Sequence, residues 1–109
     1  MKKEDKELLL KDLCARLPYG VKIDKVLYGA TTLHERDIES FRNGFVDILK
    51  PYLRPMSAIT DEEYNEYLRM IHEENSYTIN DYLNSIHVDY RGLIEKGLAL
   101  VAPEGMYNN

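Results

Sequence analysis

Three histidines and a run of acids are the side chains of this 109-residue chain that could do acid–base or metal chemistry. His34, His72 and His87 lie on three separate predicted elements, and no pair has the i, i+4 spacing that places two metal ligands on one helix face. The sequence therefore predicts no metal site. The alternative is a small enzyme in which His72 or His87 works with neighbouring acids.

The acids of residues 61–66 and 73–74 fall on the polar face of a predicted amphipathic helix. A carboxylate works as a general acid or base near neutral pH only when burial or a neighbouring charge shifts its pKa. A solvated helix face does not supply those surroundings. We therefore predict no catalytic residue among these acids.

The motifs of common nucleotide-binding and hydrolytic enzymes do not occur in the sequence. It contains no GxGxxG or GxxxxGKS/T glycine loop, no HExxH and no GxSxG. Cys14 is the only cysteine, which excludes an internal disulfide and a cysteine-based metal site within one chain. Because leucines surround Cys14, we predict that it is a small core side chain. We expect a protein that uses no cofactor and is not an enzyme.

The formal charge of −5 is concentrated in one segment. Residues 61–75 carry six acids and one base, whereas residues 1–25 carry seven bases and five acids. Binding to the phosphate backbone of a nucleic acid needs a basic face, so this balance does not favour such a function. Two nucleic-acid hypotheses remain: the acidic helix mimics DNA and inhibits a DNA-binding protein, or a small basic patch binds directly. That patch would comprise Lys2, Lys3, Lys6, Lys11, Lys22 and Lys25.

The tyrosines give the best indication of a binding surface. Three of the nine fall in predicted loops, where an amphipathic ring often serves recognition. The segment KPYLRPMS, residues 50–57, is stiffened by two prolines, so little entropy is lost when a partner orders it. The predicted partner-binding residues are Tyr52, Leu53, Arg54, Tyr19 and Tyr107. The alternative, which we favour for this segment, is a structural crossover that packs Tyr52 and Leu53 onto the rest of the domain.

Hydrophobic periodicity predicts the elements of the N-terminal half. Leu10, Leu13, Cys14 and Leu17 share one face of a helix over residues 5–17, which Pro18-Tyr19-Gly20 ends. Asp12 and Arg16 are expected on the other, solvated face. Alternation then predicts a strand over residues 21–27. Residues 33–48 allow two interpretations. One is a helix that starts at a Thr32–Glu35 capping box and stops at Asn43-Gly44, with a strand at 45–49; the other is a hairpin that turns at Asn43-Gly44. We favour the helix.

The C-terminal half is predicted to be mainly helical. Thr60 and Glu63 form a capping box before a helix whose buried stripe comprises Tyr64, Tyr67, Leu68 and Ile71. A shorter helix follows, with Ile79, Tyr82, Leu83 and Ile86 directed inward. Asp89 is predicted to cap a helix of two turns that Gly97 ends, before a strand at 98–102.

Together these elements predict an α+β fold in a single small domain, residues 1–109. Four or five helices would pack on a small two- to three-stranded sheet built from residues 21–27, 45–49 and 98–102. The longest apolar runs are far shorter than the roughly 20 residues that cross a bilayer, so we expect no membrane contact. The predicted core comprises Leu10, Leu13, Leu17, Val21, Ile23, Phe41, Tyr64, Leu68, Ile71, Leu83, Ile86, Leu93 and Ile94.

Three strings carry a resemblance: LLLKDLCARLPYGVK (8–22), KPYLRPMS (50–57) and DYLNSIHVDYRGLIEKGLALVAPEGMY (81–107), which includes DYRGLIEKGLA. Together they resemble a family of small uncharacterised proteins from gut anaerobic bacteria and their prophages or mobile elements. The resemblance covers roughly half the chain, and residues 24–49 match less clearly. It implies a bacterial or phage protein of the cytoplasm, and it implies no activity, cofactor or site residue.

The function expected from the sequence is that of a non-enzymatic protein-interaction module, such as an accessory protein of a phage or mobile element. Its partner would be another protein. The alternative is a nucleic-acid-associated protein or an acidic DNA-mimic inhibitor of a DNA-binding protein. An N-terminus that mixes acids and bases without an apolar h-region is unlike a signal peptide, which also predicts the cytoplasm.

Overall fold

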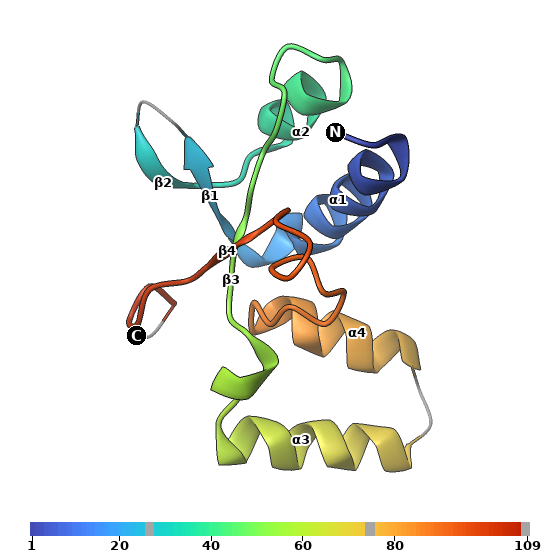
Figure 1. Ribbon diagram of the computed structural model, residues 1–109. Coiled ribbons are helices and arrows are strands. Elements are labelled where there is room, and N and C mark those ends of the chain that lie inside the picture. Colours follow the sequence, from blue (N-terminus) through green and yellow to red (C-terminus); the bar gives the residue numbers. More distant parts are fainter. Residues whose placement is uncertain (26–27, 74–75, 108–109) are drawn as a thin grey trace.

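The computed structural model describes residues 1–25, 28–73 and 76–107. In Figure 1 this part of the chain forms four α-helices and two two-stranded sheets, which confirms the predicted α+β class. The helices are α1 (Lys3–Arg16), α2 (Glu35–Arg42), α3 (Asp61–His72) and α4 (Ser76–Ser85). The strands are β1 (Lys22–Lys25), β2 (Gly29–Thr32), β3 (Tyr52–Leu53) and β4 (Leu100–Val101). Short 3₁₀ turns cover Leu17–Tyr19 and Met56–Ala58.

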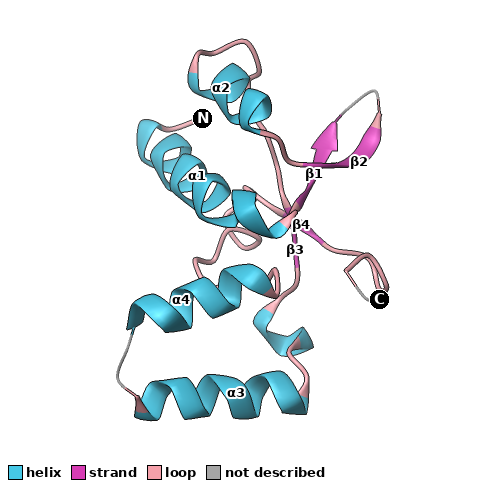
Figure 2. Ribbon diagram, turned by 180° about the vertical axis from the view of Figure 1, so that it is seen from behind, coloured by secondary structure: helices cyan, strands magenta, loops and turns pink. Residues whose placement is uncertain are grey.

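The helices form two groups on either side of the short strands β3 and β4. Figures 1 and 2 show α1, α2 and the antiparallel β1–β2 ribbon on one side, and the α3–α4 hairpin on the other. Helix α4 packs against α1, whereas α3 packs against α4 farther out. The molecule is elongated as a result, with principal extents of 42, 28 and 24 Å.

Residues 50–54 form the centre of the fold. The backbone of this segment hydrogen-bonds to three segments that are far away in the sequence, with N···O distances of 2.7–3.0 Å. The bonds join Asp24 to Lys50, Leu100 to Pro51, Ala102 to Leu53, and Arg54 to both His87 and Asp89. Successive residues use opposite edges of the segment, as in a strand between two neighbours. The predicted strand at 45–49 is therefore wrong. The backbone pairing expected of it is made by residues 50–54 instead.

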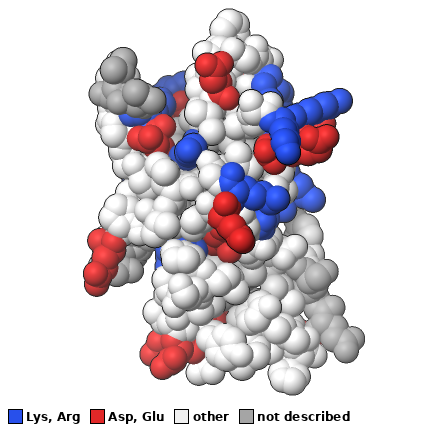
Figure 3. Space-filling view, in the orientation of Figure 1, with Lys and Arg blue, Asp and Glu red and all other residues white. Residues whose placement is uncertain are grey.

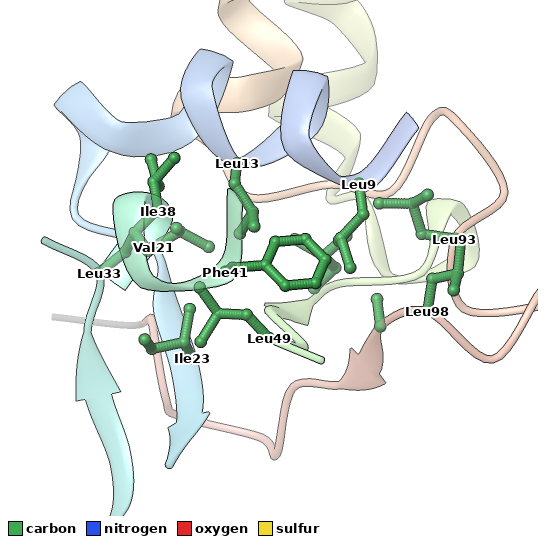
Figure 4. Close-up of a cluster of buried hydrophobic side chains, with 12 residues drawn as sticks. Leu9, Leu13, Val21, Ile23, Leu33, Ile38, Phe41, Leu49, Leu93 and Leu98 are labelled. Atoms are coloured by element: carbon green, nitrogen blue, oxygen red, sulfur yellow. The ribbon is translucent and has the colours of Figure 1, made fainter. Parts of the chain in front are cut away.

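The main hydrophobic core surrounds Phe41 of α2. Figure 4 shows its ring between Leu9 and Leu13 of α1 on one side and Leu49 and Ile23 on the other. Six predicted core residues are buried: Leu13, Val21, Ile23, Phe41, Leu83 and Leu93. Others escaped prediction, including Leu9, Leu33, Ile38, Leu49, Leu53, Val88, Leu98 and Ala99. Several of these lie in loops or short strands, where no periodic pattern marks the buried positions.

The buried face of α1 differs from the predicted face. Leu9 and Leu13 are fully buried, but so are Asp12 and Arg16, which were expected to face solvent. The Asp12 carboxylate accepts a 2.8 Å bond from Arg16 Nε, and Arg16 Nη2 donates a 2.8 Å bond to the Val88 carbonyl. These bonds allow two charged side chains to lie inside. The buried face therefore runs through these two residues, and Cys14, predicted to be in the core, is exposed.

The segment after the β1–β2 ribbon is a helix, as favoured, and not a hairpin. It starts two positions later than predicted, with His34 as the cap: Asp37 Oδ2 accepts a 2.9 Å bond from the His34 backbone N–H, and Thr32 is part of β2. Gly44, with φ +82°, follows the end of α2. Residues 26 and 27 of the predicted first strand lie outside the described residues.

The predicted helix at 89–97 is a series of turns. Asp89 does act as a cap, because its two carboxylate oxygens accept 3.0 Å bonds from the backbone N–H groups of Leu93 and Ile94. Gly92, however, has a φ of +76°, in the left-handed region. A residue in that conformation cannot continue a right-handed helix, which explains why the periodic pattern failed here.

Candidate partner-binding surface

The KPYLRPMS segment is not an exposed binding loop. Leu53 is fully buried and Tyr52 is half-buried, because both belong to the central segment. The alternative interpretation, a crossover that packs these two residues onto the domain, is therefore the one that the structure shows. Leu53 offers no surface to a partner.

Arg54 ties the centre of the fold to the beginning of α3. Its guanidinium bonds both carboxylate oxygens of Glu63, at 2.9 and 2.7 Å, and also donates to the carbonyl oxygens of Ile86 and Ala58. Both charged side chains are 19% exposed. The Arg54 guanidinium lowers the pKa of Glu63 to about 2. Arg54 therefore has a structural role that fixes one end of α3.

Tyr107 fastens the C-terminal segment to the same centre. Its hydroxyl donates a 2.7 Å bond to the Tyr52 carbonyl and accepts a 2.8 Å bond from the Lys22 backbone N–H. Burial raises the pKa of Tyr107 to about 12. Tyr107 and Arg54 line one hollow of about 310 Å³, so the structure does bring two of the predicted residues together. Their polar groups, however, are engaged within the protein.

Tyr19 is the fifth predicted residue, and it lies at a different place. Its hydroxyl hydrogen-bonds the Asp81 carboxylate, which connects the 3₁₀ turn after α1 to α4. This bond raises the pKa of Tyr19. The five predicted residues therefore do not form one binding surface.

The largest departure from the sequence prediction is on α3. Tyr64, Leu68 and Ile71 were expected in the core, but they are 49%, 37% and 41% exposed. Their i, i+4, i+7 spacing places them on one face of the helix. Among the described residues of α3, only Met70 is buried. We call the exposed row Tyr64, Leu68 and Ile71 the α3 stripe.

The α3 stripe is exposed because α3 rests on α4 along a different line of side chains. Met70 is buried and Tyr67 is half-buried, whereas the stripe lies beside them. The ring of Tyr64 is 6.4 Å from that of Tyr67, so the stripe continues toward the buried line. The apolar face of α3 is thus wider than the contact with α4 can cover.

Helix α3, which carries the stripe, is acidic as a whole. It has four acids and one arginine, a formal charge of −3. Arg69 bridges Glu66 and Glu73, and Glu63 is held by Arg54. In the view of Figure 3 the α3–α4 hairpin carries few charged side chains, apart from an acidic group at the end where α3 begins. The α3 stripe is therefore an apolar row on an acidic helix.

A second group of exposed apolar side chains lies on the other side of the molecule. Its members are Tyr28, Phe45, Val46 and Ile48. All of them except Phe45 line a hollow of about 400 Å³, where Lys25 and Asp37 form a 2.9 Å ion pair. The last three residues belong to the loop that was predicted to be a strand. Because they stand on a loop and not on a regular helix, they form a less defined surface than the α3 stripe.

The histidines do not gather at one site. His34 precedes α2 and His72 ends α3, both exposed, whereas His87 is half-buried and stacks on Tyr107. Within residues 1–25, 28–73 and 76–107, no group of three or more His, Cys, Asp or Glu side chains is arranged to hold a metal ion. None of the helices described in this structure is long and apolar enough to span a membrane.

The lysines of the predicted basic patch are partly used within the protein. Lys25 pairs with Asp37, Lys22 Nζ donates a 2.7 Å bond to Thr32, and Lys6 lies over the ring of Phe41.

Comparisons of the chain with protein-family models, curated proteins and solved structures give no match.

Proposed function

We propose that this protein is a non-enzymatic protein-interaction module and that it binds its partner on the α3 stripe. The observation that carries the proposal is the exposure of three large apolar side chains on one face of a regular helix. Scattered exposed apolar residues are normal, whereas a contiguous apolar row on one helix face is typical of an interaction site. A partner helix or strand that covers the row would remove its apolar area from water.

The charge of α3 indicates the chemistry of the partner. Since α3 has a formal charge of −3, a second copy packed on the stripe would bring two acidic helices together. Like charges across an interface cost free energy, which disfavours self-association through this face. We therefore propose a different protein, one that offers an apolar row bordered by Lys or Arg side chains.

The resemblance of the sequence to small proteins of gut bacteria and their mobile elements supports a narrower version of the same proposal. In that version the module is an accessory protein of a phage or mobile element and works in the bacterial cytoplasm. A DNA-mimic function draws less support from α3. Two of its acids, Glu63 and Glu66, are paired with arginines, and the row beside them is apolar.

A binding experiment with defined peptides tests the proposal. Two helical peptides share an apolar row and differ in its border, which is lysine in one and glutamate in the other. Binding would be followed by NMR on the ¹⁵N-labelled protein. We expect the lysine-bordered peptide to shift the amide signals of residues 64, 68 and 71 and the glutamate-bordered peptide to bind at least tenfold more weakly. Higher salt should reduce this difference.

Matched variants make the experiment decisive. Leu68→Ser with Ile71→Ser removes two stripe residues, and Val46→Ser with Ile48→Ser removes two residues of nearly equal exposure from the other apolar group. Only the first pair should abolish peptide binding and the capture of a nuclease-resistant partner from a native lysate. Equal binding by both variants would refute the proposal. So would stripe-dependent dimerisation in sedimentation, or captured material that disappears with nuclease.

A further inference from the structure

A second hollow, separate from the α3 stripe, lies between α1, α4 and the loop after Val88. Its volume is about 360 Å³, which is within the range of pockets for small molecules. We call it the α1–α4 hollow. Its walls include Cys14 of α1, Asp81 and Asn84 of α4, and Tyr90 and Arg91 of the loop. Asp81 and Asn84 are three residues apart, so they share a face of α4.

One wall of the α1–α4 hollow belongs to a buried cluster with surplus positive charge. The Asp12 carboxylate lies between two guanidiniums, 2.8 Å from Arg16 Nε and 3.0 Å from Arg91 Nε. One carboxylate and two guanidiniums leave a formal charge of +1 in a cluster where Arg16 is fully buried and Arg91 is 15% exposed. Uncompensated charge in such surroundings is costly. An anion beside Arg91, on the side of the hollow, would compensate it.

The position of Arg91 is fixed by its neighbours. Besides the bond to Asp12, its Nη2 donates a 2.8 Å bond to the Tyr90 hydroxyl, and its guanidinium carbon lies 4.8 Å from the centre of the Tyr90 ring. A guanidinium held in this way loses little further entropy when a carboxylate binds to it. The cation is therefore preorganised.

The facing wall of the hollow offers acceptors for a hydrogen-bond donor. Asn84 is only 4% exposed, and its Oδ1 has no hydrogen-bond partner in the part of the chain that the structure describes. That oxygen is itself buried and is not open to a ligand in the hollow. Asp81, one turn earlier, places a carboxylate on the same wall and is oriented by the Tyr19 hydroxyl. An ammonium group in the hollow would pair with this carboxylate.

We propose that the α1–α4 hollow binds a small zwitterion of the free amino acid class. Its carboxylate pairs with Arg91, and its ammonium group faces the Asp81 carboxylate. The cation on one wall and the acceptors on the other give the hollow a polarity that neither a simple carboxylate nor a simple amine can satisfy at both ends. The proposal is independent of the α3 stripe, since no stripe residue lines the hollow.

Cys14 provides a native reporter, because it is exposed and lines the hollow. The probes would be the common amino acids, each at millimolar concentration, and the measurement would be the rate at which iodoacetamide alkylates Cys14. We expect at least one amino acid to slow alkylation and to shift the NMR signal of the Asn84 side-chain amide. Its carboxamide derivative, and the matching acid without the amino group, should bind at least tenfold more weakly.

Two variants give the control. Asp81→Asn should weaken the binding of the amino acid about tenfold while retaining an acceptor for Tyr19, whereas Asp61→Asn on α3 should have no effect. Binding that survives loss of either the carboxylate or the ammonium group of the probe would overturn the proposal. Failure of every amino acid to protect Cys14 would do the same.

Discussion

The ring of His87 lies on the ring of Tyr107, with the two centroids 3.8 Å apart and an angle of 15° between the planes. His87 adopts a φ of +64°, which is uncommon for a residue other than glycine. Tyr107 is held in turn by its two hydroxyl hydrogen bonds to the central segment and to β1. The stack thus connects the end of the α4 region to the C-terminal segment over the middle of the fold.

The hydroxyl of Tyr107 should contribute measurably to stability. In Tyr107→Phe the Lys22 N–H and the Tyr52 carbonyl both lose a partner, while the ring and its stack are retained. A buried backbone group left without a partner costs about 1–3 kcal/mol, so we expect a loss of that size in the free energy of unfolding. Urea unfolding measures it. Tyr28→Phe, at an exposed tyrosine, should change it by less than about 0.5 kcal/mol.

The stability of the protein should decrease as the pH falls from about 6.5 to about 4. Burial, followed by the charges of Arg16 and Arg54, lowers the pKa of His87 to about 4. In the unfolded chain the pKa of histidine is about 6.5, so between these values the unfolded chain binds a proton that the folded protein does not. Linkage then makes the free energy of unfolding fall with decreasing pH.

Two substitutions attribute this pH dependence to His87. His87→Asn removes the titrating group and uses a residue that tolerates a positive φ, so the slope of stability between pH 6.5 and 4 should flatten. His34→Asn changes an exposed histidine and should leave the slope as it is. An unchanged slope in His87→Asn would show that another group is responsible. Chemical unfolding at several pH values supplies the data.

The ion pair between Arg54 and Glu63 should stabilise the protein above pH 4.5 and progressively less at lower pH. The pKa of Glu63 falls from 4.5 to about 2 on folding, so the unfolded chain takes up a proton first as the pH decreases. At neutral pH, Glu63→Gln should cost about 1–3 kcal/mol. The difference in unfolding free energy between the two proteins should shrink toward pH 2. A constant difference would contradict the role of the charge.

Loss of the carboxylate at Asp12 should be the most damaging single polar change. In Asp12→Asn the fully buried Arg16 loses its counter-charge, and breaking a buried pair in this way costs about 3–5 kcal/mol. Asp5→Asn, nearer the start of the same helix, should cost less than about 1 kcal/mol through the helix dipole. Thermal and urea unfolding of the two variants compare these values. A loss below about 1 kcal/mol in Asp12→Asn would contradict the importance of the pair.

Local chemistry in the sequence was enough to predict much of the helical structure. Thr60 and Glu63 cap α3 as expected, since both halves of the capping box lie within four residues. Asn43-Gly44 ends α2 for a similarly local reason. Such signals act within a few residues, although strand pairing overrode the similar Thr32–Glu35 signal.

The residues that the sequence misplaced depend on distant partners. Asp12 and Arg16 read as solvated positions because the acceptor that helps to bury Arg16 is the carbonyl of Val88. Leu53 read as a loop residue because its strand neighbours lie near residue 100. Hydrophobic spacing marked Leu68 as apolar and on a helix face, but it could not show that this face stays exposed among the residues that the structure describes. No signal in the sequence marked the hollow beside Asn84.

The central position of residues 50–54 has a consequence for how the chain folds during synthesis. The neighbours of this segment come from residue 24, from residues 87–89 and from residues 100–102. On the ribosome the segment therefore emerges long before its last neighbours, and Leu53 lacks its partner strand until those arrive. Closing such distant contacts is slow compared with helix formation. The nascent chain is accordingly expected to complete its fold only after the C-terminal segment has been made.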